Sequence, residues 1–406
     1  MRATEPVLII GAGPTGLSAA LALGLEGIPA IVFEADSQLP HDLRAGSFHP
    51  PTIEMLTKLG VGDAMHATGI VVPRWQVRDR LAGVVAEFDL SLLRDETPYP
   101  YRLHLEQHRL TPLLLAEIAA HAPSVDVRFA SPVAAVAQDA AGVSVTLASG
   151  ETVRGSYAVG CDGARSVVRA AMGVEFEGFT WPERYLVAST TFDLGALGFS
   201  GAGYIADPDA WAAVFHVPDI GPPGLWRIAY PIPPEADQDA ELQDAPIQRQ
   251  LATLLVSVGG APAGGFPIKY ASVYKVHQRV AQRFVAGRLV LAGDAAHVNN
   301  PLGGLGLNGS VHDAVNLAAK LVSIVKGDAE ADDALDLYDR QRRPINVRAV
   351  QAMSIRNKRL LEEKDPAIRR AHLDEQRALA NDPVKAKAHL MNTSMINSVR
   401  EAASIA

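Results

Sequence analysis

The sequence predicts an α/β fold in which parallel strands alternate with helices, because three strand-and-turn segments recur along the chain. The most informative is residues 287–320, which join a short apolar run, a glycine-rich loop and a long helical pattern. The run at 289–292 is apolar throughout, which is typical of a strand buried in a parallel sheet. Asp294 follows at the carboxyl end of this strand, where open α/β sheets place their ligands. We therefore expect a ligand site at this end of the sheet.

The loop after Asp294 suits a flat, electron-rich ligand. Its glycines let the backbone approach a ligand without Cβ clashes. Apolar residues recur at helical spacing from Ser310, so we expect a helix to start there, with its free N–H groups and positive dipole end toward the ligand. The alternative is an ordinary strand–loop–helix connection, for which so many glycines beside one carboxylate would be unusual.

The amino-terminal segment has the G-x-G-x-x-G spacing of a dinucleotide-binding turn. An apolar run at 7–10 leads directly into three glycines, Gly11, Gly13 and Gly16. The first glycine makes the tight turn, the second admits a pyrophosphate and the third lets helix and strand pack closely. Glu34 ends the next apolar run, where an acidic residue accepts hydrogen bonds from the adenosine ribose. This arrangement favours FAD or NAD over NADP.

A third carboxylate, Asp162, also stands at the end of an apolar run, residues 157–161, and Gly163 completes the turn. The preceding Cys161, the single cysteine of the chain, is expected to pack as a small apolar side chain. Short apolar runs at 125–129, 133–138 and 143–147, joined by turns, predict a β-meander.

Composition narrows the function classes. A chain of 406 residues that is 48% hydrophobic and 20% charged suits a compact protein of two or three domains. A net charge of −8 without a dense Lys/Arg tract argues against a nucleic-acid partner. We expect a cytoplasmic protein without a membrane partner, because no signal peptide or long apolar span is found. The histidines are scattered, so no metal site is expected.

The motifs GAGPTG, CDGARSVVR and GDAAHVNNPLGGLGLN occur in this order, and together they resemble the single-component flavoprotein aromatic hydroxylases, the para-hydroxybenzoate hydroxylase family. The resemblance extends from about residue 5 to residue 345 and implies a Rossmann-like FAD-binding domain of the GR2 type with its β-meander, a mixed-sheet substrate domain and carboxyl-terminal helices. Asn300 departs from the family, in which a second proline is common. The implied division is FAD binding at 1–70, 101–175 and 281–347, substrate binding at 71–100 and 176–280, and a helical segment at 348–406.

The resemblance also assigns residues to the cofactor. The ADP half of FAD would be held by the amino-terminal glycines and Glu34, and the pyrophosphate and NAD(P)H region by Asp162 and Gly163. Arg44 matches an arginine that contacts the flavin in this family, and Gln107 matches a glutamine near the ribityl chain. Asp294 would bind the ribityl hydroxyls. The isoalloxazine would be lined by residues 301–308, among them Pro301, Gly304, Gly306, Leu307 and Asn308.

The activity implied by the family is monooxygenation. In this family NADH or NADPH reduces FAD, and we expect it to dock only transiently because the chain has one dinucleotide fold. O2 then adds at the flavin C4a position, and the resulting hydroperoxide hydroxylates a small phenol or aromatic acid. A phenol with a pKa of about 10 is only about one part in a thousand ionised at neutral pH, so the site must stabilise the phenolate. Candidate catalytic residues are Arg44 and Pro301 beside the flavin, and His216, Arg227 and Tyr230 on a predicted hairpin, among which the sequence does not choose.

Three alternatives remain at this stage. One is another FAD enzyme of the same fold, such as an epoxidase or a halogenase, although the halogenase WxWxIP signature is absent. The second is a non-catalytic binding protein on a flavoprotein fold, which would not need intact flavin motifs. The third is a plain NAD dehydrogenase, which would not need the loop after Asp294.

The amphipathic segment at 389–402 would pack across the FAD-binding domain or against a second subunit, so a homodimer is one expectation.

Overall fold

The computed structural model describes residues 5–40, 46–219 and 224–406. One half of the molecule is built on a six-stranded sheet in the order β18-β19-β12-β1-β2-β8. At its centre, β1 pairs in parallel with β2 and β12, and β12 pairs in parallel with β19. These strands are buried almost throughout, which accounts for their apolar sequences. Their bounds are β1 Val7–Ile10, β2 Ala30–Phe33, β8 Val125–Arg128, β12 Tyr157–Gly160, β18 Val285–Ala286 and β19 Leu289–Leu291. The predicted α/β class is confirmed.

Because β1, β12 and β19 are neighbours and parallel, the three turns singled out in the sequence meet at one edge of this sheet. Helix α1 (Pro14–Leu25) follows β1 and packs against both α4 (Gln107–His121) and α8 (Leu305–Lys326). Helix α8 begins at Leu305, not at Ser310 as predicted. Gly304 takes a left-handed conformation immediately before it, so the helix starts within the glycine-rich stretch.

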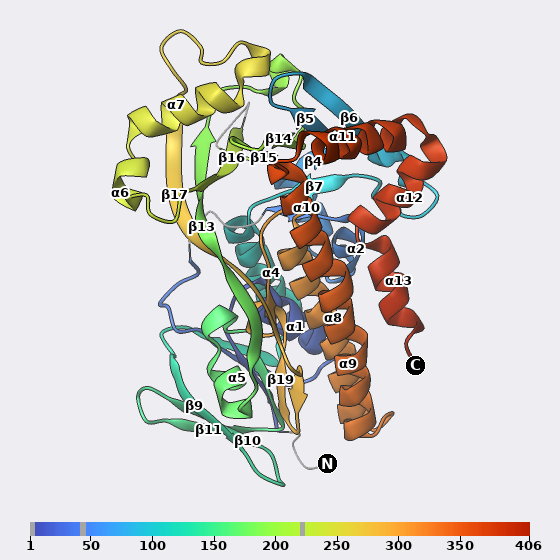
Figure 1. Cartoon of the computed structure of the whole chain (residues 1–406). Coiled ribbons are helices and arrows are strands. Elements are labelled where there is room, and N and C mark those ends of the chain that lie inside the picture. Colours follow the sequence, from blue (N-terminus) through green and yellow to red (C-terminus); the bar gives the residue numbers. More distant parts are fainter. Residues whose placement is uncertain (1–4, 41–45, 220–223) are drawn as a thin grey trace.

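The β-meander lies beside this sheet at the lower end of Figure 1, and its composition differs from the prediction. It consists of β9 (Val133–Gln138), β10 (Val143–Leu147) and β11 (Thr152–Gly155). The run at 125–129 was predicted as its first strand, which is wrong. This run forms β8 and extends the parallel sheet by pairing with β2, because α4 provides the crossover that parallel pairing needs.

An eight-stranded mixed sheet forms the other half, in the order β20-β17-β13-β16-β15-β14-β5-β6. Two long strands, β13 (Phe176–Thr190) and β17 (Ile268–Ala281), run from this sheet down toward the parallel sheet (Figure 1). The predicted hairpin is β15 (Ala212–Val217) paired with β16 (Leu225–Ile232). The remaining strands are β5 Arg74–Asp79, β6 Gly83–Asp89, β14 Ala202–Ala206 and β20 His297–Val298.

The two faces of this large sheet have different coverings. One face packs against α7 (Asp244–Leu254), in a core that includes Trp226 and Tyr230. The opposite face, with Trp75 and Tyr204, packs against the carboxyl-terminal helices and against Leu302. Leu302 belongs to the loop before α8, so this second face is the one that meets the predicted flavin loop.

A small sheet and the carboxyl-terminal helices complete the fold. The small sheet has the order β3-β7-β4, with β3 at Ser47–Phe48, β7 at Arg102–His104 and β4 at Ile70–Val72. Helix α2 (Pro50–Lys58) follows β3, and α3 (Gly62–Thr68) precedes β4. Helix α9 (Ala331–Ile345) leads through a π-helical turn into α10 (Ala352–Glu362), α11 (Pro366–Asn381), α12 (Pro383–Thr393) and α13 (Ile396–Ser404), drawn in orange to red in Figure 1. The predicted domain boundaries stay a prediction.

Neither a membrane span nor a metal cluster is found in the described part of the chain. No helix there is both long and apolar enough to cross a bilayer. No group of three or more His, Cys, Asp or Glu side chains in residues 5–40, 46–219 and 224–406 is arranged to hold a metal ion.

Candidate active site

The glycine turn between β1 and α1 combines two tight contacts with one open position. Gly11 has a φ of +105°, and a Cβ there would lie 2.5 Å from the carbonyl oxygen of Cys161. A Cβ on Gly16 would lie 1.9 Å from the Gly11 carbonyl oxygen. In contrast, a Cβ on Gly13 would meet nothing within 4 Å, although Gly13 is the N-cap of α1. The turn therefore leaves room for a ligand at the positive end of a helix, which is what a pyrophosphate requires.

Glu34 and Asp162 flank this turn. The two Glu34 carboxylate oxygens accept the backbone N–H groups of Ala12 (2.8 Å) and Asp36 (3.0 Å), which fixes this side chain beside the glycines. One Asp162 oxygen accepts the Val167 N–H at 2.7 Å, and the other is buried and accepts no hydrogen bond within the described residues. Burial raises the pKa of the Asp162 carboxyl. An acceptor left open beside Gly163 fits a hydroxyl or N–H donor of a bound cofactor.

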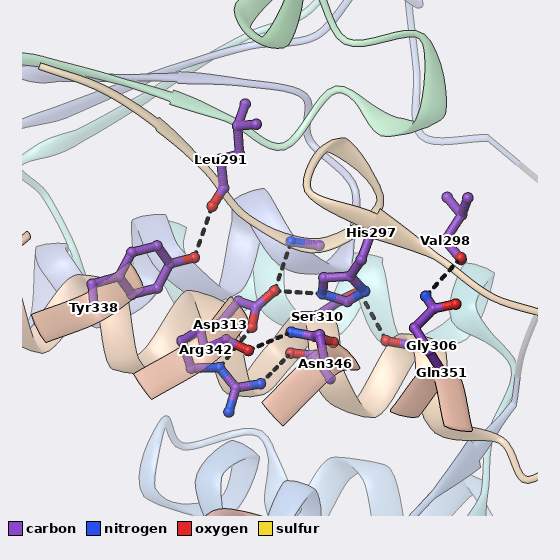
Figure 2. A network of polar contacts seen from close by, with 12 residues as sticks. Leu291, His297, Val298, Gly306, Ser310, Asp313, Tyr338, Arg342, Asn346 and Gln351 are labelled. Atoms are coloured by element: carbon purple, nitrogen blue, oxygen red, sulfur yellow. Dashed lines mark hydrogen bonds and ion pairs between the residues drawn. The ribbon is translucent and has the colours of Figure 1, made fainter. Parts of the chain in front are cut away.

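Asp294 lies in a short turn, Gly293–Ala295, directly after β19, and its side chain is exposed. A buried carboxylate, Asp313 of α8, holds this turn in place (Figure 2). One Asp313 oxygen accepts the Gly293 N–H at 3.1 Å and lies 2.7 Å from His297 Nε2; the other accepts Arg342 Nε at 2.7 Å. The network thus joins the Asp294 turn, α8 and α9.

The Asp313 carboxylate is ionised despite full burial. Burial by itself would raise its pKa, but the charges and hydrogen bonds of Arg342 and His297 outweigh burial and hold the pKa at about 2. Tyr338 extends the network by donating its hydroxyl to the Leu291 carbonyl at 2.7 Å (Figure 2). Sequence reasoning missed this group; the available signal was an acidic residue within an otherwise apolar face of a predicted helix.

The glycine-rich loop is clamped to the small sheet. The side-chain amide of Asn308 accepts the His49 N–H and donates to the Ser47 carbonyl, both at 2.8 Å. Gly303 and Gly304 have φ values of +113° and +65°. Pro301 precedes them and is half-buried, whereas Gly306, Leu307 and Asn308 form the first turn of α8. The backbone N–H groups of this turn lie at a helix amino terminus, and their assignment to the flavin ring stays a prediction.

A group of buried polar side chains lies between this loop, the small sheet and the second face of the large sheet. His49 Nε2 lies 2.8 Å from the Gly303 carbonyl, and Tyr204 lies beside the Gly303 backbone. The Arg102 guanidinium lies over the Trp75 ring, 5.4 Å from its centroid. Several buried atoms of this group have no hydrogen-bond partner within the described residues: Ser47 Oγ, His49 Nδ1, Trp75 Nε1, Arg102 Nε and His104 Nε2.

Unsatisfied buried groups of this kind are completed by ordered water or by a ligand. Sequence reasoning missed this group as well. The available signal was the alternation of Arg102 and His104 in a short strand that ends just before Gln107.

The three predicted catalytic residues of the hairpin are distributed over both faces of the large sheet. Arg227 is in register with Phe215, so it faces the same side as Trp75 and Tyr204. Its guanidinium lies 3.5 Å from Glu106, the N-cap of α4. Gln107, the first residue of α4, is half-buried beside this ion pair.

His216 and Tyr230 lie on the other face of the sheet. The His216 ring stacks on Trp226 with 4.6 Å between centroids, and Tyr230 is buried in the core with α7. Strand alternation therefore places Arg227 on the face that meets the loop before α8, and His216 and Tyr230 on the opposite face. The backbone carbonyl of His216 nevertheless lies 2.7 Å from His104 Nδ1 of the small sheet. Arg44 lies outside the described residues.

A dinucleotide turn, an open carboxylate acceptor beside it and a group of buried polar side chains near the α8 amino terminus are the features of a dinucleotide-binding enzyme. The chain belongs to the FAD binding domain family, whose model matches residues 4–353. It is 35% identical to para-nitrophenol 4-monooxygenase of Pseudomonas sp. (strain WBC-3) over 374 residues, 91% of this chain and 90% of that protein.

Solved structures agree with this assignment. The crystal structure of p-nitrophenol 4-monooxygenase from Pseudomonas putida DLL-E4 superposes with a TM-score of 0.88 at 31% identity, covering 98% of this chain and 99% of that one. A flavin-dependent monooxygenase in complex with FAD and substrate superposes with a TM-score of 0.77 at 27% identity, covering 99% and 72%.

These findings confirm the predicted family. The protein is a FAD-dependent aromatic monooxygenase, with NAD(P)H as electron donor and O2 as co-substrate, as is typical of its relatives. The relatives named above are monooxygenases, which favours this function over the halogenase and binding-protein alternatives.

Proposed function

We propose that this enzyme hydroxylates a small phenol bound in the chamber between β7, β14 and the loop at 301–304. The observation that carries the proposal is the set of buried, unsatisfied polar atoms that reaches the Gly303 backbone. The aromatic residues Trp75 and Tyr204 lie on the sheet face beside these polar groups, and small-molecule sites generally combine the two kinds of side chain. Because two relatives act on para-nitrophenol, we propose 4-nitrophenol as the first substrate to test.

The residues present fit FAD at the adjoining sheet edge. We propose that the α1 amino terminus at Gly13 receives the pyrophosphate, that Glu34 receives the adenosine ribose and that Asp162 serves the pyrophosphate region. Asp294 would accept the ribityl hydroxyls, with Gln107 nearby, and the backbone of residues 301–308 would face the flavin ring. When bound, FAD would pass electrons from NAD(P)H to O2 and so activate it for transfer of one oxygen atom to the ring. The chain itself would orient the phenol and keep water out.

The carboxyl-terminal helices support the proposed role of the chain in keeping water away from the substrate. The face of the large sheet that carries Trp75 and Tyr204 is covered by a core to which these helices contribute Leu361 of α10, and Leu390 and Met391 of α12. We propose that residues 348–406 close the substrate chamber from outside. We further propose a cytoplasmic location, supported by the dependence on NAD(P)H, and retain the homodimer as a prediction that light scattering tests directly.

The experiment that tests this function is product analysis under ¹⁸O2. The purified enzyme with FAD and NADH or NADPH should convert 4-nitrophenol, or a related phenol, to a product that carries one labelled oxygen atom. NAD(P)H oxidation that is neither stimulated by any phenol nor accompanied by a labelled product would contradict the proposal.

A further inference from the structure

Arg102 differs from the other buried arginines because neither an anion nor a neutral hydrogen-bond acceptor among the described residues pairs with it. Its side chain makes no ion pair or hydrogen bond with any described residue, although the residue is only 4% exposed. Arg342 is equally buried but pairs with Asp313 at 2.7 Å. Arg78, also 4% exposed, donates to the Gln76 side chain at 2.9 Å and to the Gly198 carbonyl at 3.1 Å. A buried guanidinium without such partners is strongly unfavourable unless a ligand supplies the negative charge.

The groups around Arg102 do not supply that charge. His104, with a pKa lowered to about 3, and His389, at about 4, are kept neutral by burial and by neighbouring arginines, Arg102 among them. Burial and the Arg102 charge likewise lower the pKa of His49, and burial raises the pKa of Tyr204. All four side chains are therefore uncharged at neutral pH, and Arg102 is left as a cation among neutral aromatic rings.

The position of Arg102 connects this charge to the reaction site. Two of these neutral neighbours, His49 and Tyr204, contact the backbone of Gly303 in the loop before α8. The guanidinium also lies over Trp75, on the face of the large sheet that meets Leu302 of the same loop. A ring bound in this chamber would therefore have the flavin loop on one side and a fixed positive charge within reach of its oxygen substituent.

We propose that Arg102 is a specificity-determining residue, which binds the phenolate oxygen of the substrate and makes the enzyme select the ionised phenol. This inference rests on the proposed function, because it names the charge state of the substrate in the same chamber. A hydrogen bond between a guanidinium and an oxyanion is stronger than one between neutral groups, and it favours ionisation of the phenol.

The test is the affinity of the FAD-loaded enzyme for 4-nitrophenol and for 4-nitrotoluene, a neutral molecule of similar shape. Isothermal titration at mildly alkaline pH, where the phenol is ionised, should show about 10- to 100-fold tighter binding of 4-nitrophenol. In Arg102→Met this preference should disappear, while the affinity for 4-nitrotoluene stays within about twofold. Arg78→Met is the matched control, since Arg78 is equally buried but lies on the face of the large sheet opposite to Trp75. This variant should retain the preference.

Two outcomes would overturn the inference. Equal affinity of the unmodified enzyme for the two ligands would do so without any variant, even if Arg102→Met failed to fold. Retention of the preference in Arg102→Met would do so directly, whether or not this variant also lost FAD. Formation of the ¹⁸O-labelled product by the unmodified enzyme separates these failures from a failure of the proposed function.

Discussion

The buried Asp313 network gives the most quantitative prediction, because the substitution Asp313→Asn removes one charge from a fully buried pair. The Arg342 side chain is 3% exposed and the Asp313 side chain 0%. Leaving one member of such a pair without its partner costs about 3–5 kcal/mol. At roughly 2.1 cal/mol/K of unfolding entropy per residue, 406 residues convert this loss into a decrease in Tm of about 4–6 °C.

The matched control is Asp336→Asn. Asp336 forms an ion pair with Arg340 at 2.6 Å, but both side chains are exposed, at 65% and 46%. Exposed pairs one helical turn apart contribute about 0.3–0.5 kcal/mol, so Tm should change by less than about 1 °C. Both variants would be compared with the unmodified protein by circular dichroism and by differential scanning calorimetry.

A second measurement on Asp313→Asn follows from its contact with Gly293. Because Asp313 positions the turn that carries Asp294, the FAD dissociation constant should increase as well. A variant with unchanged Tm and unchanged FAD affinity would refute the claim that this ion pair supports the cofactor site.

Three further predictions concern the cofactor turns and acid stability. Gly13→Ala should weaken FAD binding at least about tenfold without lowering the Tm of the FAD-free protein, because the added Cβ enters open space. Gly16→Ala should instead destabilise the fold itself, because its Cβ would clash with the Gly11 carbonyl, and FAD titration and melting curves distinguish the two variants. Asp294→Ala should purify without flavin colour, and a fully yellow preparation would count against its assignment to the ribityl chain. The pKa of Asp313 falls from 3.8 to about 2 on folding, so its contribution of about 2 kcal/mol to the free energy of unfolding should be present above pH 4 and be lost as the pH falls toward 2. Asp313→Asn should lack this part of the acid transition. An identical acid transition in both proteins would argue against this prediction.

The FAD-binding half could be predicted from sequence because its turns impose strict local requirements. Gly11 and Gly16 are required by backbone contacts in which a Cβ does not fit, and such requirements are visible in a single sequence. The start of α8 was misplaced by five residues, since the stretch before Ser310 is rich in glycine and lacks the composition of a helix. Only the left-handed conformation of Gly304 shows that the helix begins earlier.

The substrate chamber could not be predicted, because it depends on contacts between distant segments. His49, Arg102, Tyr204 and Gly303 come from four elements, and each taken alone resembles an ordinary polar or core residue. Strand alternation places Arg227 and its immediate neighbours in β16 on opposite faces, but it does not reveal which face of a sheet packs on the flavin loop. That information comes from tertiary packing, through Leu302 and the carboxyl-terminal helices.

The central claim is that one FAD binds where the three turns meet, with a phenol in the chamber beside it. Anaerobic mixing of the purified protein with NADH or NADPH, with and without 4-nitrophenol, tests this most directly. Bound flavin should lose its yellow colour faster when the phenol is present. A colourless protein that takes up no added FAD, or a reduction rate that no phenol changes, would contradict the account.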